Sequence, residues 1–215
     1  MSRPPLDLTL YLVTDPGLCR GLGVAETAAR AAAAGATVVQ LRDPDGTDDE
    51  FVRHGRELRA ALGPSGVPLI VNDRAHLVDP IGADGVHVGQ QDLPAEKARE
   101  VVGEHRVLGL SVQSREHVAR ARELADGTVD YLGVGPVWAQ ATKPDAAEAG
   151  GTETLAAVVA DSPWPCVAIG GIDEARVGAV RRTGAVGVAV VSAICGSADV
   201  AEATRTLRRA WEEAG

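Results

Sequence analysis

The feature of this sequence that most constrains its fold is an alternation, repeated eight times, between a short apolar run and a longer amphipathic stretch. Runs this short predict strands, and the stretches between them predict helices. Because the runs are apolar on both faces, we expect parallel strands covered by helices. The expected strands span residues 8–14, 37–42, 68–73, 85–89, 107–112, 131–135, 166–171 and 187–193.

Eight strand–helix units in 215 residues predict an α/β fold, a single (βα)8 TIM barrel formed by residues 1–215 as one domain. An open, doubly wound sheet is the alternative, but it usually has fewer strands, and no Gly-x-Gly-x-x-Gly pattern follows the first strand. Ser114 and Asp173 stand where helix N-caps are expected. Gly35 and Gly184 stand where a helix ends on a left-handed residue.

Composition excludes several classes of protein. A net charge of −9 argues against a nucleic-acid partner, which would need a basic face. The three cysteines, Cys19, Cys166 and Cys195, form no Cys-x-x-Cys pair and suit free thiols in a reducing compartment. No run approaches the ~18 apolar residues of a membrane span, and the N-terminus lacks a signal peptide's apolar core. We therefore expect a cytoplasmic protein without a membrane partner.

Polar residues and glycines end almost every expected strand, at the edge where a barrel of this kind carries its active site. Gln40 and Arg42 share one face of their strand, and Val39 and Leu41 share the other. Asn72 and Ser111 end two further strands, and Ser111 shares its face with Gly109. Turns or helix caps would explain any one such residue, but their recurrence favours a binding site.

Asp73 and Asp92 follow the third and fourth expected strands. Neighbouring strands lie about 4.8 Å apart, so both carboxylates could reach one ion. Two carboxylates with water and phosphate oxygens are the usual ligands of Mg²⁺. The alternative is that Asp92 only begins the turn before Pro94.

The ends of the last two expected strands predict a phosphate-binding site. Gly170 and Gly171 end the seventh and Ser192 lies in the eighth, where barrels often bind phosphate through backbone N–H groups. A tight turn alone is the alternative for the two glycines. The long segment 135–151 contains Lys143, one of only two lysines, whose compact ammonium suits an anion unless it is simply a solvated loop residue.

Taken in order, the motifs YLVTD, VQLRD, VNDRA, HVGQQDLP, GLSVQS, YLGVGPVW with TKP, AIGGI and VVSAI resemble the thiamine phosphate synthase family. The resemblance covers most of the chain. It implies a (βα)8 barrel and a transferase that joins a hydroxymethylpyrimidine diphosphate to a hydroxyethylthiazole phosphate, releasing diphosphate. Small molecules are then the partners, Mg²⁺ is the cofactor, and assembly into a homo-oligomer stays open.

The resemblance also implies roles on the pyrimidine side. Gln40, Arg42 and Asn72 would contact the pyrimidine diphosphate, Ser111 would bind the ring, and Lys143 would bind the diphosphate. Arg42, Lys143 and Ser111 are the expected catalytic residues. The expected magnesium ligands are Asp73 and Asp92.

On the thiazole side, the resemblance implies phosphate binding by Thr142, Gly171, Val191 and Ser192. Gln140 is a further expected substrate-binding residue. The implied reaction is dissociative: diphosphate leaves, a pyrimidine methyl cation forms, and the thiazole nitrogen attacks it. No protein nucleophile is then required, which agrees with the absence of a Ser-His-Asp or Cys-His pattern. His87, on the fourth expected strand, is interpreted as an interior residue with satisfied hydrogen bonds rather than as a catalyst.

Two positions depart from the family pattern. Pro44 stands where the family usually has a lysine, and Gln140 replaces a threonine. These departures keep open a non-catalytic protein that binds phosphate ligands. A thiazole tautomerase on the same barrel is a further alternative, although its usual histidine is Gln113 here.

Overall fold

The structure, a computed structural model, describes residue 3 and the ranges 6–140 and 148–215. Strands β1 to β8 pair in parallel and in chain order, and β8 pairs with β1 to close a barrel. The prediction of a (βα)8 barrel is therefore confirmed, and the open sheet is excluded. The strands are β1 (Leu10–Val13), β2 (Val38–Leu41), β3 (Leu69–Asn72), β4 (Gly85–Val88), β5 (Val107–Val112), β6 (Tyr131–Val134), β7 (Cys166–Ile169) and β8 (Gly187–Val190).

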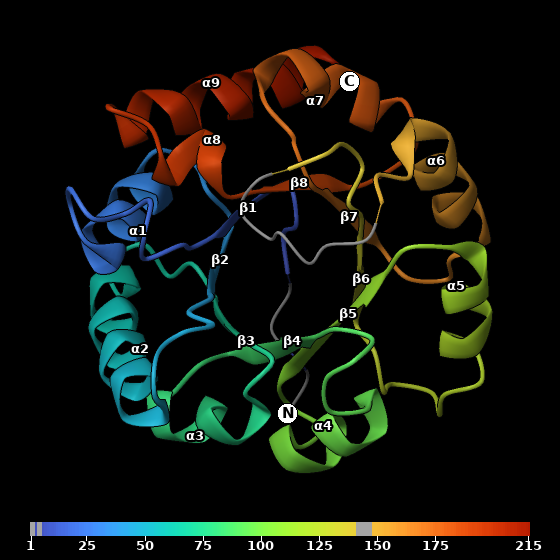
Figure 1. The fold of residues 1–215 in the computed structure, drawn as a ribbon, viewed down its shortest axis with the longest axis horizontal. Helices are drawn as coiled ribbons and strands as arrows, with labels where there is room; N and C mark the ends of the chain where they lie inside the picture. The colour runs from blue at the N-terminus through green and yellow to red at the C-terminus, as the bar shows by residue number, and fades with distance from the viewer. Residues whose placement is uncertain (1–2, 4–5, 141–147) are drawn as a thin grey trace.

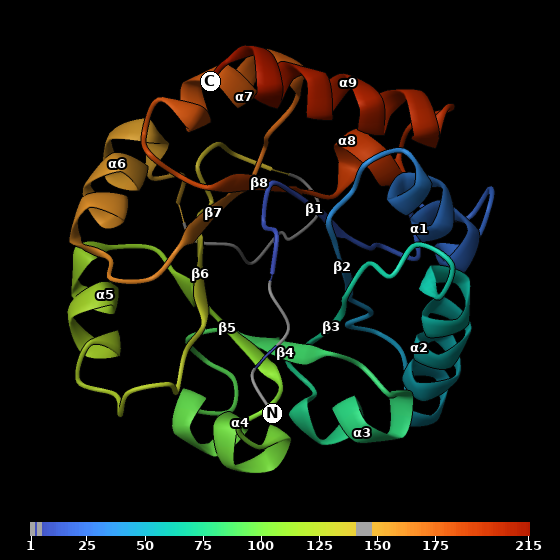
Figure 2. The same ribbon diagram turned by 180° about the vertical axis from the view of Figure 1, so that it is seen from behind.

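The helices form a ring around these strands in Figure 1, and Figure 2 shows the same ring from behind. Helix α9 packs against both α7 and α1, so the end of the chain completes the ring. None of the described helices combines the length and the apolar character needed to cross a membrane. The helices are α1 (Val24–Ala33), α2 (Asp48–Leu62), a 3₁₀ turn η1 (Ala75–Leu77), α3 (Val78–Ile81), α4 (Ala95–Val102), α5 (Arg115–Ala121), α6 (Gly151–Asp161), α7 (Glu174–Arg181), α8 (Ser192–Cys195) and α9 (Val200–Glu213).

Several strands end earlier than the sequence predicts, because the backbone turns sharply at the carboxyl end of the barrel. The expected seventh strand extends to residue 171, but β7 ends at Ile169. Gly170 and Gly171 follow with φ values of 105° and 64°, which lie outside the strand region. The third expected strand loses its last residue, Asp73, for the same reason, since its φ is 61°.

Side chains alternate between two apolar layers. Val39 and Leu41 belong to the large outer layer between strands and helices. The smaller inner layer fills the barrel and includes Val38, Ile70 and Tyr131. The predicted alternation along β2 is confirmed, and Gln40 lies on the inner face with only 5% of its surface exposed.

The predicted helix boundaries are also confirmed. Ser114 and Asp173 are the N-caps of α5 and α7, and each side chain accepts a backbone hydrogen bond from the third residue after it. Gly35 and Gly184 follow α1 and α7 with φ values of 116° and 86°. These local signals fix where the chain leaves each helix for the next strand.

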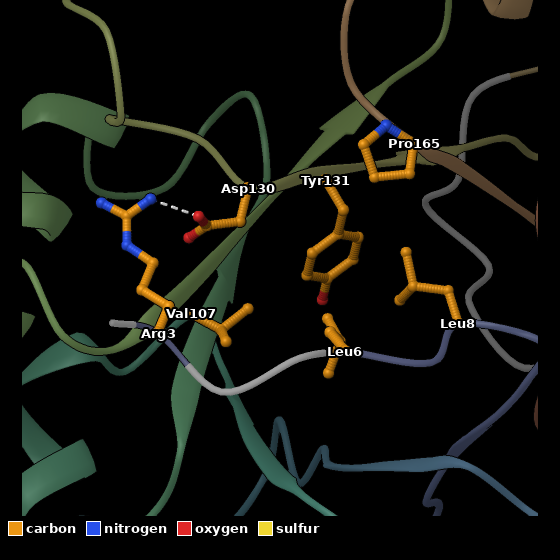
Figure 3. A pocket seen from close by; sticks show the side chains of 7 residues that line it. All are labelled: Arg3, Leu6, Leu8, Val107, Asp130, Tyr131 and Pro165. Carbon is orange, nitrogen blue, oxygen red and sulfur yellow. Dashed lines mark hydrogen bonds and ion pairs between the residues drawn. The ribbon is translucent and has the colours of Figure 1, made fainter. Parts of the chain in front are cut away.

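The amino end of the barrel is closed by the segment before β1. Figure 3 shows the ring of Tyr131 beside Leu6, Leu8 and Pro165, which line a cavity of about 230 Å³. Arg3 forms an ion pair with Asp130 at its edge. All strand residues here are the first of their strands or precede them, so this cavity lies at the opposite end from the polar strand ends.

Candidate active site

The carboxyl ends of the strands bring together most of the predicted site residues. Strand register places Gln40 next to Val13 and Ile70, Asn72 next to His87, and Ser111 next to Gly133. Because all strands are parallel, the residues that follow them lie on the same rim of the barrel. Thr142 and Lys143 lie outside the described residues.

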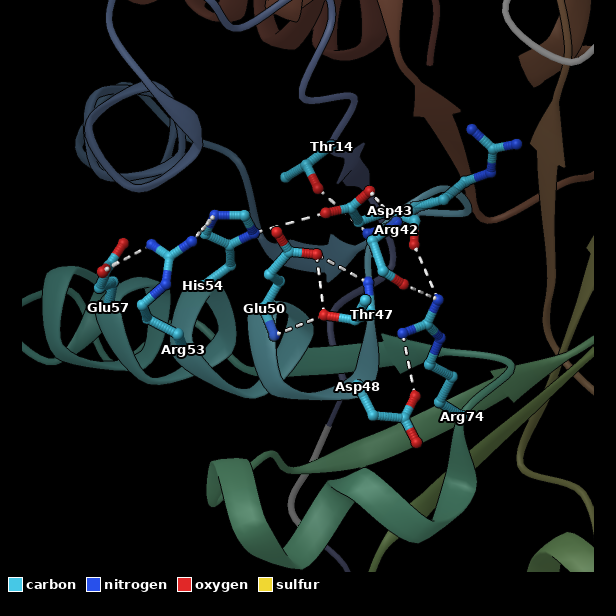
Figure 4. A network of polar contacts seen from close by, with 11 residues as sticks. Thr14, Arg42, Asp43, Thr47, Asp48, Glu50, Arg53, His54, Glu57 and Arg74 are labelled. Atoms are coloured by element: carbon cyan, nitrogen blue, oxygen red, sulfur yellow. Dashed lines mark hydrogen bonds and ion pairs between the residues drawn. The ribbon is translucent and has the colours of Figure 1, made fainter.

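Arg42 lies directly after β2 and supplies a cation at this rim. Its backbone N–H donates to Oγ1 of Thr14, at 3.1 Å, which ties it to the end of β1. Figure 4 shows its guanidinium pointing away from the polar network of the following loop. Among the described residues it forms no ion pair, so the group is available to an anion.

Arg74, in contrast, is already engaged with the protein. Its guanidinium donates to the carbonyl oxygens of Asp43 and Gly46, at 3.3 and 2.6 Å, and lies 3.1 Å from Oδ1 of Asp48. It also lies 4.7 Å from the centre of the Phe51 ring. Figure 4 shows Arg74 directed at the loop between β2 and α2. It therefore holds this loop in place, and it does not replace the cation that the family has at Pro44.

Asp73 adopts an unusual backbone conformation at the end of β3. Its φ of 61° lies in the left-handed region, and it is the only described residue other than glycine with a positive φ. Its N–H donates to the carbonyl oxygen of His87, at 2.9 Å, which ties it to β4. The side-chain amide of Asn72 donates to Oδ2 of Asp73, at 2.6 Å. This geometry holds the carboxylate at the rim instead of letting it follow the strand.

Asp92 lies in the exposed turn after β4. Its Oδ2 accepts the N–H of Gly89, at 2.9 Å, and α4 begins at Ala95 without a side-chain cap. The side chain therefore closes the turn from Gly89 to Asp92, and it does not cap α4. The carboxylate oxygens of Asp73 and Asp92 are of the kind that Mg²⁺ prefers as ligands.

Few side chains at this rim could bind a metal ion. The described residues contain no group of three or more histidine, cysteine, aspartate or glutamate side chains that could hold an ion. Two aspartates would leave most of an octahedral shell to water and substrate oxygens, which is how Mg²⁺ is usually bound. Asp73 and Asp92 supply carboxylate oxygens after β3 and β4, and Mg²⁺ takes such oxygens as ligands together with water and phosphate oxygens.

A chain of buried side chains runs across the barrel interior between two predicted site residues. Gln40 Nε2 donates to the Tyr11 hydroxyl at 2.8 Å, and the hydroxyls of Tyr11 and Tyr131 are 2.9 Å apart. His87 Nδ1 lies 3.0 Å from the Tyr131 hydroxyl, and its Nε2 lies 2.9 Å from Ser111 Oγ. The sequence pattern predicts a His87 with satisfied hydrogen bonds, and the structure adds the network to which it belongs.

Glycines make room for this chain. Gly109 pairs in register with both His87 and Tyr131, and a Cβ atom there would collide with both side chains. A Cβ atom at Gly133 would come within 2.8 Å of the His87 ring. Two inward-facing glycines on adjacent strands are therefore the sequence signal that could have revealed the chain.

The ends of β7 and β8 form the other side of the rim. A Cβ atom at Gly171 would meet the backbone oxygen of Ala139 at 2.7 Å, so the loop after β6 packs directly on this glycine. Arg176 donates to the carbonyl oxygen of Gly171 and lies 5.2 Å from the centre of the Trp138 ring. Ser192 opens the short helix α8, so its N–H has no partner within that helix.

Comparisons with known proteins agree with this geometry. The family model for thiamine monophosphate synthase matches residues 10–194. The chain is 50% identical over 206 residues to the thiamine-phosphate synthase of Xanthobacter autotrophicus, with 96% of each chain covered. It is 45% identical to the thiamine-phosphate synthase of Azorhizobium caulinodans, with 95% of each covered. The chain belongs to the thiamine monophosphate synthase family.

A solved structure supports the same family at the level of the whole fold. The thiamine phosphate pyrophosphorylase of Pyrococcus furiosus superposes with a TM-score of 0.86 at 34% identity, and 97% of each chain is covered. The curated relatives are transferases, and this member of the thiamine monophosphate synthase family is accordingly a transferase. The resemblance seen in the sequence motifs is therefore confirmed.

Proposed function

We propose that the protein synthesises thiamine phosphate from a hydroxymethylpyrimidine diphosphate and a hydroxyethylthiazole phosphate, with release of diphosphate. The observation that carries the proposal is the single rim of a closed barrel, where Arg42, Asn72 and Ser111 lie at or near the ends of their strands and Gly171 and Ser192 follow β7 and β8. Family membership gives the class of reaction. The rim offers separate groups for a ring, a diphosphate and a second phosphate.

On the pyrimidine side, Gln40 and Ser111 would hold the ring while Arg42 and Asn72 bind the diphosphate. Gln40 and Ser111 are fixed through the buried chain, so their polar groups are positioned before the substrate arrives. Lys143 would add a second cation, and it lies outside the described residues. Arg42, Lys143 and Ser111 remain the proposed catalytic residues.

Asp73 and Asp92 would hold the magnesium ion. When bound, the ion would neutralise charge on the departing diphosphate. Asn72 contributes by hydrogen bonding to the Asp73 carboxylate, at 2.6 Å, which orients this ligand. The net charge of −9 makes such local neutralisation necessary for a substrate that carries phosphates.

The chemistry then requires positioning more than a protein nucleophile. As the bond to diphosphate breaks, the cations at the rim stabilise the leaving group, and positive charge develops on the pyrimidine methylene carbon. The thiazole nitrogen attacks this carbon, provided that the second substrate is held in line with it. The residues around the rim would exclude water, which would otherwise react with the pyrimidine methyl cation.

The thiazole phosphate would bind at the ends of β7 and β8. The proposed contacts are with Thr142, Gly171, Val191 and Ser192, largely through backbone N–H groups, and Gln140 lies on the approach from the loop after β6. Thr142 lies outside the described residues. We also propose that residues 1–215 act as one catalytic domain in the cytoplasm, where three free, buried cysteines would stay reduced.

The direct test is an assay of the purified protein with both substrates and Mg²⁺, followed by chromatography of the products. We expect thiamine phosphate and diphosphate in equal amounts, with no product when either substrate or the divalent ion is omitted. Folded protein that yields no thiamine phosphate would contradict the proposal. Tight binding of the thiazole phosphate without turnover would instead identify the non-catalytic alternative.

A further inference from the structure

The five side chains that cross the barrel interior form a hydrogen-bond chain whose direction can be deduced. Tyr11 and Tyr131 are almost fully buried, at 1% and 0% exposure, so each phenolic proton needs an acceptor inside the protein. Burial also raises the pKa of both hydroxyls well above the ordinary value of 10.0, so both keep their protons at neutral pH. The direction then follows from the orientation of the Gln40 amide, whose Nε2 faces the Tyr11 hydroxyl.

With Gln40 Nε2 donating to the Tyr11 hydroxyl, the Tyr11 proton is directed to Tyr131, its other hydroxyl neighbour. Tyr131 thereby becomes an acceptor from Tyr11, so its proton is directed to Nδ1 of His87. His87 must then carry its proton on Nε2, where it donates to Ser111 Oγ. The hydroxyl proton of Ser111 is then directed away from the other four side chains of the hydrogen-bond chain.

We propose that Tyr11, Tyr131 and His87 form a one-way relay that couples the Gln40 amide to the Ser111 hydroxyl, and so presents an acceptor at one end and a donor at the other. Gln40 has its nitrogen turned to Tyr11, which leaves Oε1 for a ligand.

The consequence for the ligand is a matched pair of hydrogen bonds, and it rests on the proposed function. An aminopyrimidine offers an amino donor beside a ring nitrogen acceptor, which complements Gln40 Oε1 and the Ser111 proton. An oxopyrimidine of the same shape offers the reverse pattern, a carbonyl acceptor beside an N–H donor. To bind it, the relay would have to reverse at every link, because the buried hydroxyls cannot change direction one at a time.

Tyr11, Tyr131 and His87 are thus positioning residues that select the amino ring without touching it. The relay also explains why glycine occupies position 109, since a side chain there would separate Tyr131 from His87. A purely structural role for the three residues would require neither a fixed histidine tautomer nor a preference between the two rings. These two properties therefore separate the relay from ordinary packing.

The kinetic test compares the 4-amino and 4-oxo pyrimidine diphosphates in wild type, Tyr11→Phe and Tyr131→Phe. We expect wild type to prefer the amino ring by at least about a hundredfold in kcat/KM. Either variant should narrow this preference on the order of tenfold, through the KM for the pyrimidine, with the KM for the thiazole phosphate unchanged. Thr204→Val, which removes a buried hydroxyl of α9, is the control and should leave the preference as it is. An undiminished preference in both tyrosine variants would overturn the relay.

A second comparison uses His87→Gln and His87→Met. Glutamine offers an oxygen acceptor and an N–H donor, so it can continue the relay in the same direction, whereas methionine cannot. We expect His87→Gln to keep most of the preference for the amino ring and His87→Met to lose it. Equal preference in the two variants would contradict the proposal.

A nuclear magnetic resonance measurement on the protein alone needs no turnover. With ¹⁵N-labelled histidine, and the His87 signals identified by their loss in His87→Gln, we expect an unprotonated Nδ1 and a protonated Nε2. A protonated Nδ1 would overturn the relay even in an active enzyme. If wild type used neither ring, the proposed function would fail, and the tautomer of His87 would still decide the relay.

Discussion

At the scale of single residues, Asp73 shows how backbone strain and function meet. A left-handed conformation is unfavourable for most residues with a side chain, but aspartate and asparagine tolerate it better than others. Here φ is 61°, and the residue directly follows Asn72, the last residue of β3. The conformation sends the carboxylate to the rim, where the proposed magnesium site would use it as a ligand.

We therefore expect Asp73→Asn and Asp73→Ala to differ in stability but not in activity. Both remove the charge, so both should lower turnover strongly. Asparagine tolerates the left-handed backbone, whereas alanine should lower the free energy of unfolding by about 1 kcal/mol relative to it. Denaturant titration and the synthase assay measure the two effects separately. Equal stability of the two variants would show that the backbone at residue 73 relaxes.

At the scale of elements, several loops that follow the strands are held by a few specific contacts. Arg74 holds the loop between β2 and α2, and Gly171 lies under the loop after β6. Asp173 then starts α7 by accepting the N–H of Arg176, at 3.1 Å. The start of α7 is therefore tied to the position of Gly170 and Gly171 at the rim.

Asp173→Ala should remove this cap and lower the free energy of unfolding by about 1 kcal/mol. Because the freed end of α7 directly follows Gly171, the KM for the thiazole phosphate should rise more than the KM for the pyrimidine diphosphate. Asp173→Ser is the matched control, since serine also caps helices. A cap loss that raised only the KM for the pyrimidine would argue against a thiazole phosphate site at β7.

At the scale of the whole molecule, sequence patterns predict the barrel because each unit repeats the same local signals. The alternation of Val39 and Gln40 and the cap at Asp173 need only neighbouring residues, and the structure confirms them. The relay needs contacts across the barrel, so Tyr11 and Tyr131 could not be paired before the register was known. The position of Arg74 is likewise decided by tertiary contacts.

The two buried tyrosines also predict how the whole molecule responds to alkali. They are the only tyrosines of the chain, and burial raises the pKa of both above the ordinary 10.0. Folded protein thus keeps two protons that the unfolded chain releases above pH 10, so this contribution to stability is present below pH 10 and lost above it. The slope from these groups approaches about 2.7 kcal/mol per pH unit.

Denaturant titrations between pH 9 and 11 measure this loss, and tyrosinate absorbance should rise only as the protein unfolds. Tyr11→Phe should reduce the slope above pH 10 by about half of the tyrosine contribution. Tyrosinate formation in fully folded protein would contradict the buried relay.

The central claim is that Asp73 and Asp92 together hold one divalent ion beside a diphosphate at the rim of the barrel. The most direct measurement is the binding of Mn²⁺, a hard cation that can replace Mg²⁺, followed by electron paramagnetic resonance in the presence of diphosphate. We predict one bound ion per chain in wild type and in the control Asp126→Asn, and a large loss of affinity in both Asp73→Asn and Asp92→Asn. Unchanged binding in either of these two variants would contradict the account.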